Sequence, residues 1–290
     1  MAPMLRAAEG KHILHGQVFP GSRVIQRPTE GGFPDLRKGG IGLPTAFIFP
    51  VSVAVTPTMD IYVADAGLGA IFRIDPMLDA MNLIRGARVT QQTRIAATSD
   101  GSVIVANGSA APVLRIGRSG RIIQNIDAQL GGGSYYDEVV GDSASGRYYG
   151  LDKVQRRLEE VMPHGRGGMV LPQELVPEQA TAMAMDGQKI YLAGSGCRCL
   201  AAIDIFGMRS MEIVVEDIGP TTALAAGDGW LAAADARDRQ IKLWRKGALL
   251  AEADFAGLGL MDPRGMSISQ HSLYVADGAG RRVHSFRLRA

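Results

Sequence analysis

An aspartate, or a smaller residue in its place, recurs along the chain at nearly constant intervals, and an arginine often follows it by four positions. Repeated carboxylates could bind a metal or act as general acids and bases, and repeated arginines could bind carboxylates or phosphates. The successive intervals are 42, 45, 42, 41 and 42 residues. The recurring positions are Asp65, Asn107, Asp152, Gly194, Asp235 and Asp277.

The phrases around these positions share a pattern of two strands joined by a short turn. Apolar residues precede the recurring position by two to four places and follow it by six and nine places. β-Branched and aromatic residues flank a segment rich in Gly, Asp and Arg, which predicts a hairpin. Further short apolar runs before and after most hairpins give four strands per repeat of about 42 residues, which is typical of a propeller blade.

The sequence therefore predicts an all-β fold, a six-bladed β-propeller with four-stranded antiparallel blades. The last repeat is one strand short, because only four residues follow Phe286. We expect an N-terminal strand, at 21–28, to complete that blade and to close the ring, which removes exposed sheet edges. The expected organisation is a single domain with an arm and closing strand at 1–28, a Gly/Pro-rich loop at 29–49 and six blades at 50–290.

Two repeats resemble the NHL-repeat family of β-propellers. They read FPVSVAVTPTMDIYVADAGLGAIFRI (49–74) and DPRGMSISQHSLYVADGAGRRVHSF (262–286), and the resemblance extends over about 49–288. Propellers that resemble this chain include metal-dependent lactonases and amidating lyases, which gather Glu, Asn, Asp or His ligands around the central tunnel. The chain departs from the family three places after the aspartate, where an asparagine is usual and this chain has Leu68, Ala110, Gln155, Cys197, Asp238 and Gly280.

A structural role explains the recurring aspartates better than shared catalysis. An aspartate at a strand end can accept hydrogen bonds from the backbone N–H groups of the following turn, and this role is available in every blade. Asn107 and Gly194 at the same position favour turn geometry, because a catalytic set would require its carboxylates.

The expected innermost strands carry mostly small or apolar residues, and only the third repeat offers carboxylates, Asp137, Glu138 and Asp142. A catalytic metal needs about three converging protein ligands, and one blade cannot surround a tunnel. The histidines occupy no equivalent repeat positions, and we expect them to face solvent. We therefore predict no catalytic residue, no metal and no cofactor. The five histidines are His12, His15, His164, His271 and His284.

The arginines are the strongest candidates for binding, because equivalent blades would place them on one face. Such a crescent could attract an acidic protein surface, a carboxylate ligand or phosphates, although arginines also solvate exposed turns. Aromatic side chains are not interleaved with them, which argues against nucleic acid. The predicted binding residues are Arg156, Arg157, Arg198, Arg237, Arg239, Arg281 and Arg282.

The remaining features narrow the class of protein. Cys197 and Cys199 are the only cysteines, too few for a disulfide framework, and we expect ordinary turn residues there. A formal charge of +2 is too small to indicate a nucleic-acid partner. The sequence shows no signal-peptide pattern and no 18-residue apolar span, which favours the cytoplasm or an assembled particle over a membrane.

These patterns favour a rigid, non-enzymatic propeller scaffold that binds another protein or a larger assembly through one loop face. Two alternatives stay open. One is a structural subunit of a large assembly such as a virion or a secretion machine. The other is a metal-dependent enzyme, lactonase-like or lyase-like, with its site in the central tunnel.

Overall fold

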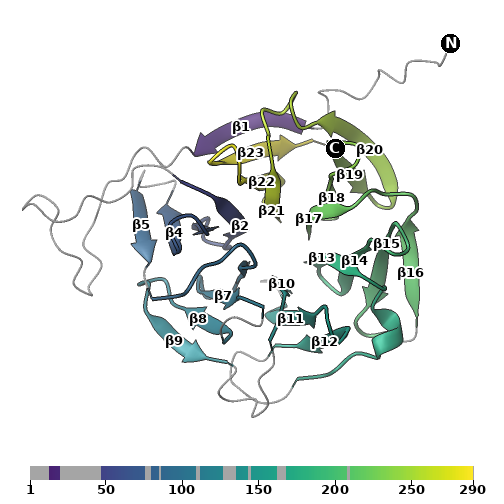
Figure 1. Cartoon of the computed structure of the whole chain (residues 1–290), viewed down its shortest axis with the longest axis horizontal. Coiled ribbons are helices and arrows are strands. Elements are labelled where there is room, and N and C mark those ends of the chain that lie inside the picture. Colours follow the sequence, from purple (N-terminus) through teal and green to yellow (C-terminus); the bar gives the residue numbers. More distant parts are fainter. Residues whose placement is uncertain are drawn as a thin grey trace, which may run out of the picture.

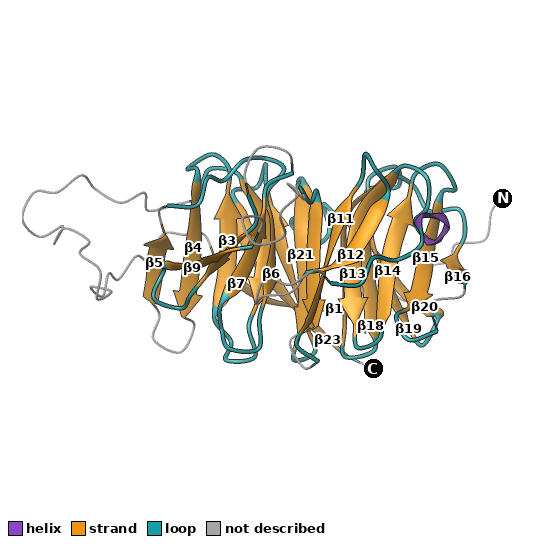
Figure 2. Ribbon diagram, turned by 90° about the horizontal axis from the view of Figure 1, so that it is seen from below, coloured by secondary structure: helices purple, strands orange, loops and turns teal. Residues whose placement is uncertain are grey.

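A computed structural model shows a ring of six small antiparallel sheets around a central axis (Figure 1). Seen from the side, the strands run along the height of a short, thick disc (Figure 2). The all-β, six-bladed prediction is confirmed. The structure describes residues 13–19, 47–75, 80–84, 86–108, 112–126, 135–142, 145–161, 168–207 and 210–289, with the backbone alone for 13–19 and 80.

Each blade is a meander of strands that begins at the axis and ends at the rim. Blade one contains β2 (Pro50–Val55), β3 (Ile61–Asp65), β4 (Ala70–Asp75) and β5 (Ala80–Ile84). Blade two contains β6 (Arg94–Ala97), β7 (Val103–Ala106), β8 (Leu114–Ile116) and β9 (Ile122–Asn125). Blade three contains β10 (Glu138–Asp142), β11 (Arg147–Asp152) and β12 (Arg157–Glu160).

The second half of the ring follows the same order. Blade four contains β13 (Ala180–Asp186), β14 (Lys189–Gly194), β15 (Cys199–Asp204) and β16 (Met211–Val215). Blade five contains β17 (Thr221–Gly227), β18 (Trp230–Asp235), β19 (Gln240–Arg245) and β20 (Ala248–Asp254). Blade six contains β21 (Pro263–Ser269), β22 (Ser272–Asp277), β23 (Arg282–Leu288) and, at its rim, β1 (Ile13–Phe19).

Blade three departs from the four-stranded pattern. Within its described residues the sheet has three strands, and an isolated bridge between Glu159 and Val170 stands at its outer edge. A single-turn 3-10 helix, η2 (Gln173–Leu175), lies between this edge and blade four. No helix formed by the described residues has the length and apolar character needed to span a bilayer.

An N-terminal strand closes the ring, as the sequence predicts, but at a different place. β1 pairs antiparallel with β23, with Ile13 opposite Leu288 and Phe19 opposite Val283. The rim position expected for 21–28 therefore belongs to Ile13–Phe19, and residues 21–28 and the loop at 29–46 lie outside the described residues. Sequence pattern alone does not separate the two apolar segments, because both have strand character.

The core lies between neighbouring blades, where the two faces of each sheet meet those of the next. The cluster between blades five and six contains Trp230, Leu243, Val275 and Phe286, all at most 2% exposed. Alanine is frequent in the strands nearer the axis, as in Ala232 to Ala234, because the wedge narrows there and large side chains do not fit.

The joint between blades six and one requires a glycine. A Cβ added to Gly265 would lie 2.6 Å from Ser52 Cα and 2.8 Å from Val51 O, both backbone atoms of β2. We expect Gly265→Ala to lower the free energy of unfolding by about 1–3 kcal/mol, measured by urea denaturation. The matched variant Gly257→Ala lies in an exposed turn where a Cβ would meet only Asp254 O, at an ordinary contact distance of 3.5 Å, and should stay within about 0.5 kcal/mol of the parent. Equal midpoints for the two variants would contradict this prediction.

Candidate functional site

The topology places every innermost strand in the same direction, so all six begin on one face of the disc. The turn between the second and third strand of each blade lies on that same face. Hydrogen bonds show this directly, because Asp65 at the end of β3 accepts from the backbone amides of Ile48 and Phe49, just before β2. We call this side the arginine face, after the turn residues Arg156, Arg198, Arg239 and Arg281.

The recurring aspartates hold these turns, and their predicted structural role is confirmed. Asp65 also accepts from the amide of Leu68, in its own turn. Asp277 accepts in the same way from the amides of Met261, Asp262 and Gly280. Each carboxylate therefore ties the turn to the segment entering the innermost strand of its own blade.

The four arginines of the arginine face occupy a backbone position that favours glycine. Their φ angles are 52°, 52°, 54° and 56°, and Gly69, at the same place in blade one, has φ 63°. Left-handed backbone of this kind costs a non-glycine residue roughly 1–2 kcal/mol. The turn thus has the same backbone geometry in blade one and in the four blades with arginine. It does not depend on the arginine side chain, because Gly69 adopts it as well.

The side chains of three of these arginines reach toward the next blade. Arg156 donates to the carbonyl of Val176, Arg198 pairs with Asp217, and Arg239 donates to the carbonyl of Met261 at 3.5 Å. Arg237 also contacts Asp217, at 3.3 Å, and Arg157 pairs with Glu159. Arg281 and Arg282 are exposed. The contacts of Arg156, Arg198 and Arg239 link neighbouring blades, and a binding role for the seven arginines stays a prediction.

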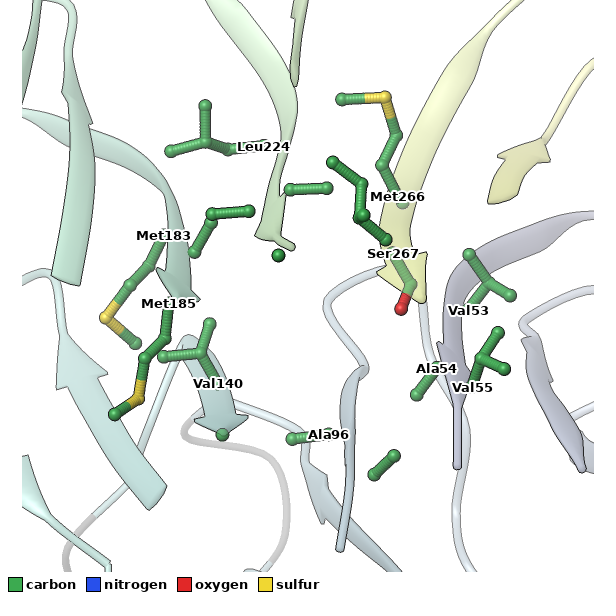
Figure 3. A pocket seen from close by; sticks show the side chains of 18 of the residues that line it. Val53, Ala54, Val55, Ala96, Val140, Met183, Met185, Leu224, Met266 and Ser267 are labelled. Atoms are coloured by element: carbon green, nitrogen blue, oxygen red, sulfur yellow. The ribbon is translucent and has the colours of Figure 1, made fainter. Parts of the chain in front are cut away.

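The six innermost strands line a central channel, a cavity of about 510 Å³. Many of the side chains that line it are apolar, three methionines among them (Figure 3), while polar atoms make up the larger share of its exposed surface. Unbranched methionine side chains fill irregular spaces and adapt to different contacts. The side chains that Figure 3 shows on the wall include Val53, Val55, Val140, Met183, Met185, Leu224 and Met266.

On the arginine face, the channel opens at a cluster that we call the charged mouth, formed by Arg94, Glu138 and Lys153. Glu138 begins β10 and is 5% exposed. Its Oε1 lies 3.3 Å from Arg94 Nε in blade two and 2.8 Å from Lys153 Nζ in the turn of its own blade. Lys153 Nζ also donates to the carbonyl of Thr181 at 2.7 Å. Two cations thus share one carboxylate, which leaves one positive charge in excess.

The opposite end of the channel is acidic. Asp142, Asp186 and Asp228 line it, and they come from blades three, four and five. Burial raises the pKa of Asp186; a hydrogen bond from the amide of Gly229 opposes this change, and the charges of Asp142 and Asp228 add to it. The two ends of the channel therefore carry charge of opposite sign.

The carboxylates that the sequence singled out do not converge. Glu138 stands at the charged mouth, Asp142 at the opposite end, and Asp137 accepts from the amide of Lys153 in a turn. Across the described part of the chain, no group of three or more His, Cys, Asp or Glu side chains is placed to hold a metal ion. Glu138 is moreover already engaged by two cations, so the donor set does not fit a tunnel metal of the kind that the family resemblance implies.

The histidines are not uniformly solvent-facing. His271 is exposed, with Nδ1 3.9 Å from Asp228 Oδ2. His284 is 2% exposed and stacks on Phe286, so the expectation was wrong for this residue. His12 and His164 lie outside the described residues, and only the backbone of His15 is described.

The two cysteines are bonded to each other, which corrects their interpretation as ordinary turn residues. Cys197 and Cys199 form a disulfide across Arg198, in the turn between β14 and β15. Two cysteines cannot build a disulfide framework, but they can form one local bridge. The spacing of two, together with Gly194 at the recurring aspartate position, was the available signal.

Sequence reasoning also missed Arg94 and Lys153. Neither repeats at an equivalent place in the other blades, so periodicity gave no reason to select them. Both residues are identified by their contact with Glu138, because the ring places its carboxylate next to Arg94 and Lys153. The charged mouth forms only because blades two and three lie side by side in the ring.

No family model and no curated protein matches the chain. Solved structures with the same fold include a gluconolactonase from Xanthomonas campestris, with 12% identity, a TM-score of 0.65 and coverage of 95% of this chain and 98% of that one. A streptogramin B lyase has 10% identity, a TM-score of 0.58 and coverage of 85% and 96%. The structure of a nidogen/laminin complex has 12% identity, a TM-score of 0.58 and coverage of 71% and 80%.

These similarities correct the function predicted from the sequence. Because solved structures with this fold include a gluconolactonase and a lyase, the expectation of a non-enzymatic scaffold for another macromolecule is withdrawn. The nidogen/laminin structure shows that propellers of this shape also occur in protein complexes. At 10–12% identity the likeness establishes the fold alone: this chain is a six-bladed β-propeller.

Proposed function

We propose that the protein binds a small organic carboxylate in the central channel, with the carboxylate at the charged mouth and an apolar body along the wall. The observation that carries this proposal is a cavity of about 510 Å³ with many apolar side chains on its wall and, at one opening, two cations that share a single carboxylate. Ligand sites are commonly cavities of this size, largely apolar and oriented by a few polar groups.

The charges at the two ends of the channel favour a negatively charged ligand and determine its orientation. At the charged mouth, Arg94 and Lys153 face a single carboxylate, so a second carboxylate would complete the pairing. At the far end, Asp142, Asp186 and Asp228 would repel an anion. An organic acid would therefore enter from the arginine face and keep its charged end there.

The seven predicted arginines support this direction of entry. They lie at the turns of blades three to six on the same face; carboxylates pair with four of them, and Arg281 and Arg282 are exposed. Surface cations of one sign raise the local concentration of anions and speed their association, an effect that salt weakens. We assign the arginine face this attracting role toward small anions.

The similarity to enzymes supports a site for a small molecule in this fold, since the neighbours include a gluconolactonase and a streptogramin B lyase. We also propose an NHL-like origin for the repeat. That origin is supported by the YVAD phrases at 62–65 and 274–277, whose aspartates hold equivalent turns.

Calorimetric titration with hexanoate, octanoate, decanoate, octanol and octylamine tests the binding proposal. Each pair of added methylenes should tighten carboxylate binding by about 15-fold, because burial of one methylene contributes about 0.8 kcal/mol. Octanoate should bind at least about tenfold more tightly than octylamine, since the mouth carries excess positive charge.

Substitutions locate the site in the same assay. Arg94→Gln should weaken octanoate binding by about tenfold or more, because it removes a charged donor. Arg287→Gln is the matched control, since this exposed arginine lies near the end of β23 on the opposite face. Equal affinity for octylamine and octanoate, or an unchanged affinity in Arg94→Gln, would overturn the proposal.

A further inference from the structure

The turn of blade four differs chemically from the other turns of the arginine face. It carries the Cys197–Cys199 disulfide, with a Cα–Cα distance of 5.2 Å and one residue, Arg198, between the bonded pair. These are the only cysteines of the sequence, so neither has another intramolecular partner.

Equivalent turns form without a disulfide. In blades one and six a carboxylate, Asp65 or Asp277, holds the turn through backbone amides. Blade four has Gly194 at that position, and a Cβ there would lie 2.8 Å from Cys197 Sγ. The sulfur thus occupies the space that the aspartate side chain fills elsewhere. The stability of the fold does not require the disulfide in place of the aspartate, because a bridge over one residue removes little chain entropy from the unfolded state.

The two sulfurs differ in access. Cys197 belongs to the exposed part of the turn, whereas Cys199 begins β15 and is 3% exposed. Cys197 is therefore the more accessible of the two residues to an external thiolate, and attack at its sulfur makes the sulfur of Cys199 the leaving group. Arg198 lies between them, on an exposed turn, and a neighbouring cation stabilises thiolates. Exposed, locally closed disulfides are the labile class, and bridges over long buried segments resist reduction.

We propose that Cys197 and Cys199 form a thiol–disulfide exchange site that oxidises dithiols. A substrate thiolate attacks Cys197 Sγ, which forms a mixed disulfide and releases Cys199 as a thiolate that takes up a proton. The second substrate thiol, after losing its proton, attacks the substrate sulfur of the mixed disulfide and expels the Cys197 thiolate. The substrate loses two electrons and two protons and becomes a disulfide, while the Cys197–Cys199 pair gains them.

This activity is independent of carboxylate binding in the channel, and a peptide assay tests it. The oxidised full-length protein is mixed with a reduced synthetic peptide that contains two cysteines, and both are followed by mass spectrometry after alkylation. The expected result is an equimolar conversion, in which each oxidised peptide matches one reduced protein. A peptide that stays reduced at the level of a protein-free control would overturn the proposal.

A matched pair of variants tests the assigned roles. With oxidised glutathione, Cys199→Ser should form a glutathione adduct at Cys197 at least about tenfold faster than Cys197→Ser does at Cys199, because thiol exchange requires access. Equal rates would contradict the assignment. The reduced protein should also retain the unfolding midpoint of the oxidised protein within a few degrees. A large drop on reduction would show a structural bridge and overturn the exchange role.

Discussion

Asp235→Ala is expected to lower the free energy of unfolding by about 3–5 kcal/mol, because it removes a buried carboxylate that accepts from one ammonium group and three backbone amides. Asp235 is fully buried, and its Oδ2 lies 2.8 Å from Lys242 Nζ, whose side chain is 10% exposed. The same carboxylate accepts from the amides of Gly219, Arg237 and Asp238. Removing it takes the acceptor from three backbone amides and leaves Lys242 Nζ with Asp238 at 2.6 Å and Glu252 at 3.9 Å.

Urea denaturation with a double-mutant cycle measures this effect. Asp235→Ala combined with Lys242→Met should cost clearly less than the sum of the two single substitutions, because both single substitutions remove the same Asp235–Lys242 contact. The control is Asp217→Asn on the same face, whose exposed side chain pairs with Arg198 and should change stability by under about 1 kcal/mol. Additive losses in the cycle would contradict the buried pairing.

The same carboxylate predicts a pH dependence. Burial alone would raise the pKa of Asp235, but the hydrogen bonds from Lys242, Gly219 and Asp238 outweigh burial and lower it. Its contribution to stability is therefore present above the pKa of the unfolded chain, near 3.9, and is lost as the pH falls through the lower folded value. The acid-induced loss of stability should be smaller in Asp235→Ala than in the parent.

Deletion of residues 1–19 is expected to destabilise the ring by about 3–5 kcal/mol and to promote aggregation. The deletion removes β1 and leaves the edge of β23 unpaired, and five residue pairs join these strands. Each net backbone hydrogen bond contributes about 0.5–1.5 kcal/mol, and an open edge templates further strand pairing. Thermal unfolding and light scattering would report the two effects.

Complementation tests whether the loss comes from this strand. A synthetic peptide of residues 10–20 should restore the melting temperature of the truncated protein in a concentration-dependent way, because binding to the folded state alone stabilises it. A scrambled peptide of the same composition should not. If the truncated protein melts like the parent, or if both peptides rescue it equally, β1 does not lock the ring.

The sequence was sufficient for the repeating part of the molecule. The constant interval predicted the blade count, and Asp65 and Asp277 perform the turn role that their position at strand ends suggested. Repeats can be recognised in the sequence because every blade packs against its neighbours in the same way and therefore needs the same pattern of apolar residues. The prediction of an N-terminal closing strand was confirmed for the same reason, since an incomplete final blade leaves an unpaired edge.

The non-repeating features could not be predicted in this way. The charged mouth depends on the contact of Glu138 with Arg94 and Lys153, which start from different places in the sequence and meet only when the ring closes. The closing strand was assigned to the wrong apolar segment, because strand propensity does not specify a distant partner. The disulfide was missed because two cysteines in a turn have no periodic counterpart.

Because β1 pairs with β23, the ring is closed, and the chain could begin in any blade without changing the order of the blades in space. Both strands lie at the rim of blade six, and Figure 1 shows them side by side. A circularly permuted chain, joined between these strands and opened at the exposed turn around Gly257, would keep every strand pairing. The chain ends therefore lie in blade six because of the order in which the gene encodes the blades. The closed ring of sheets itself has no first blade.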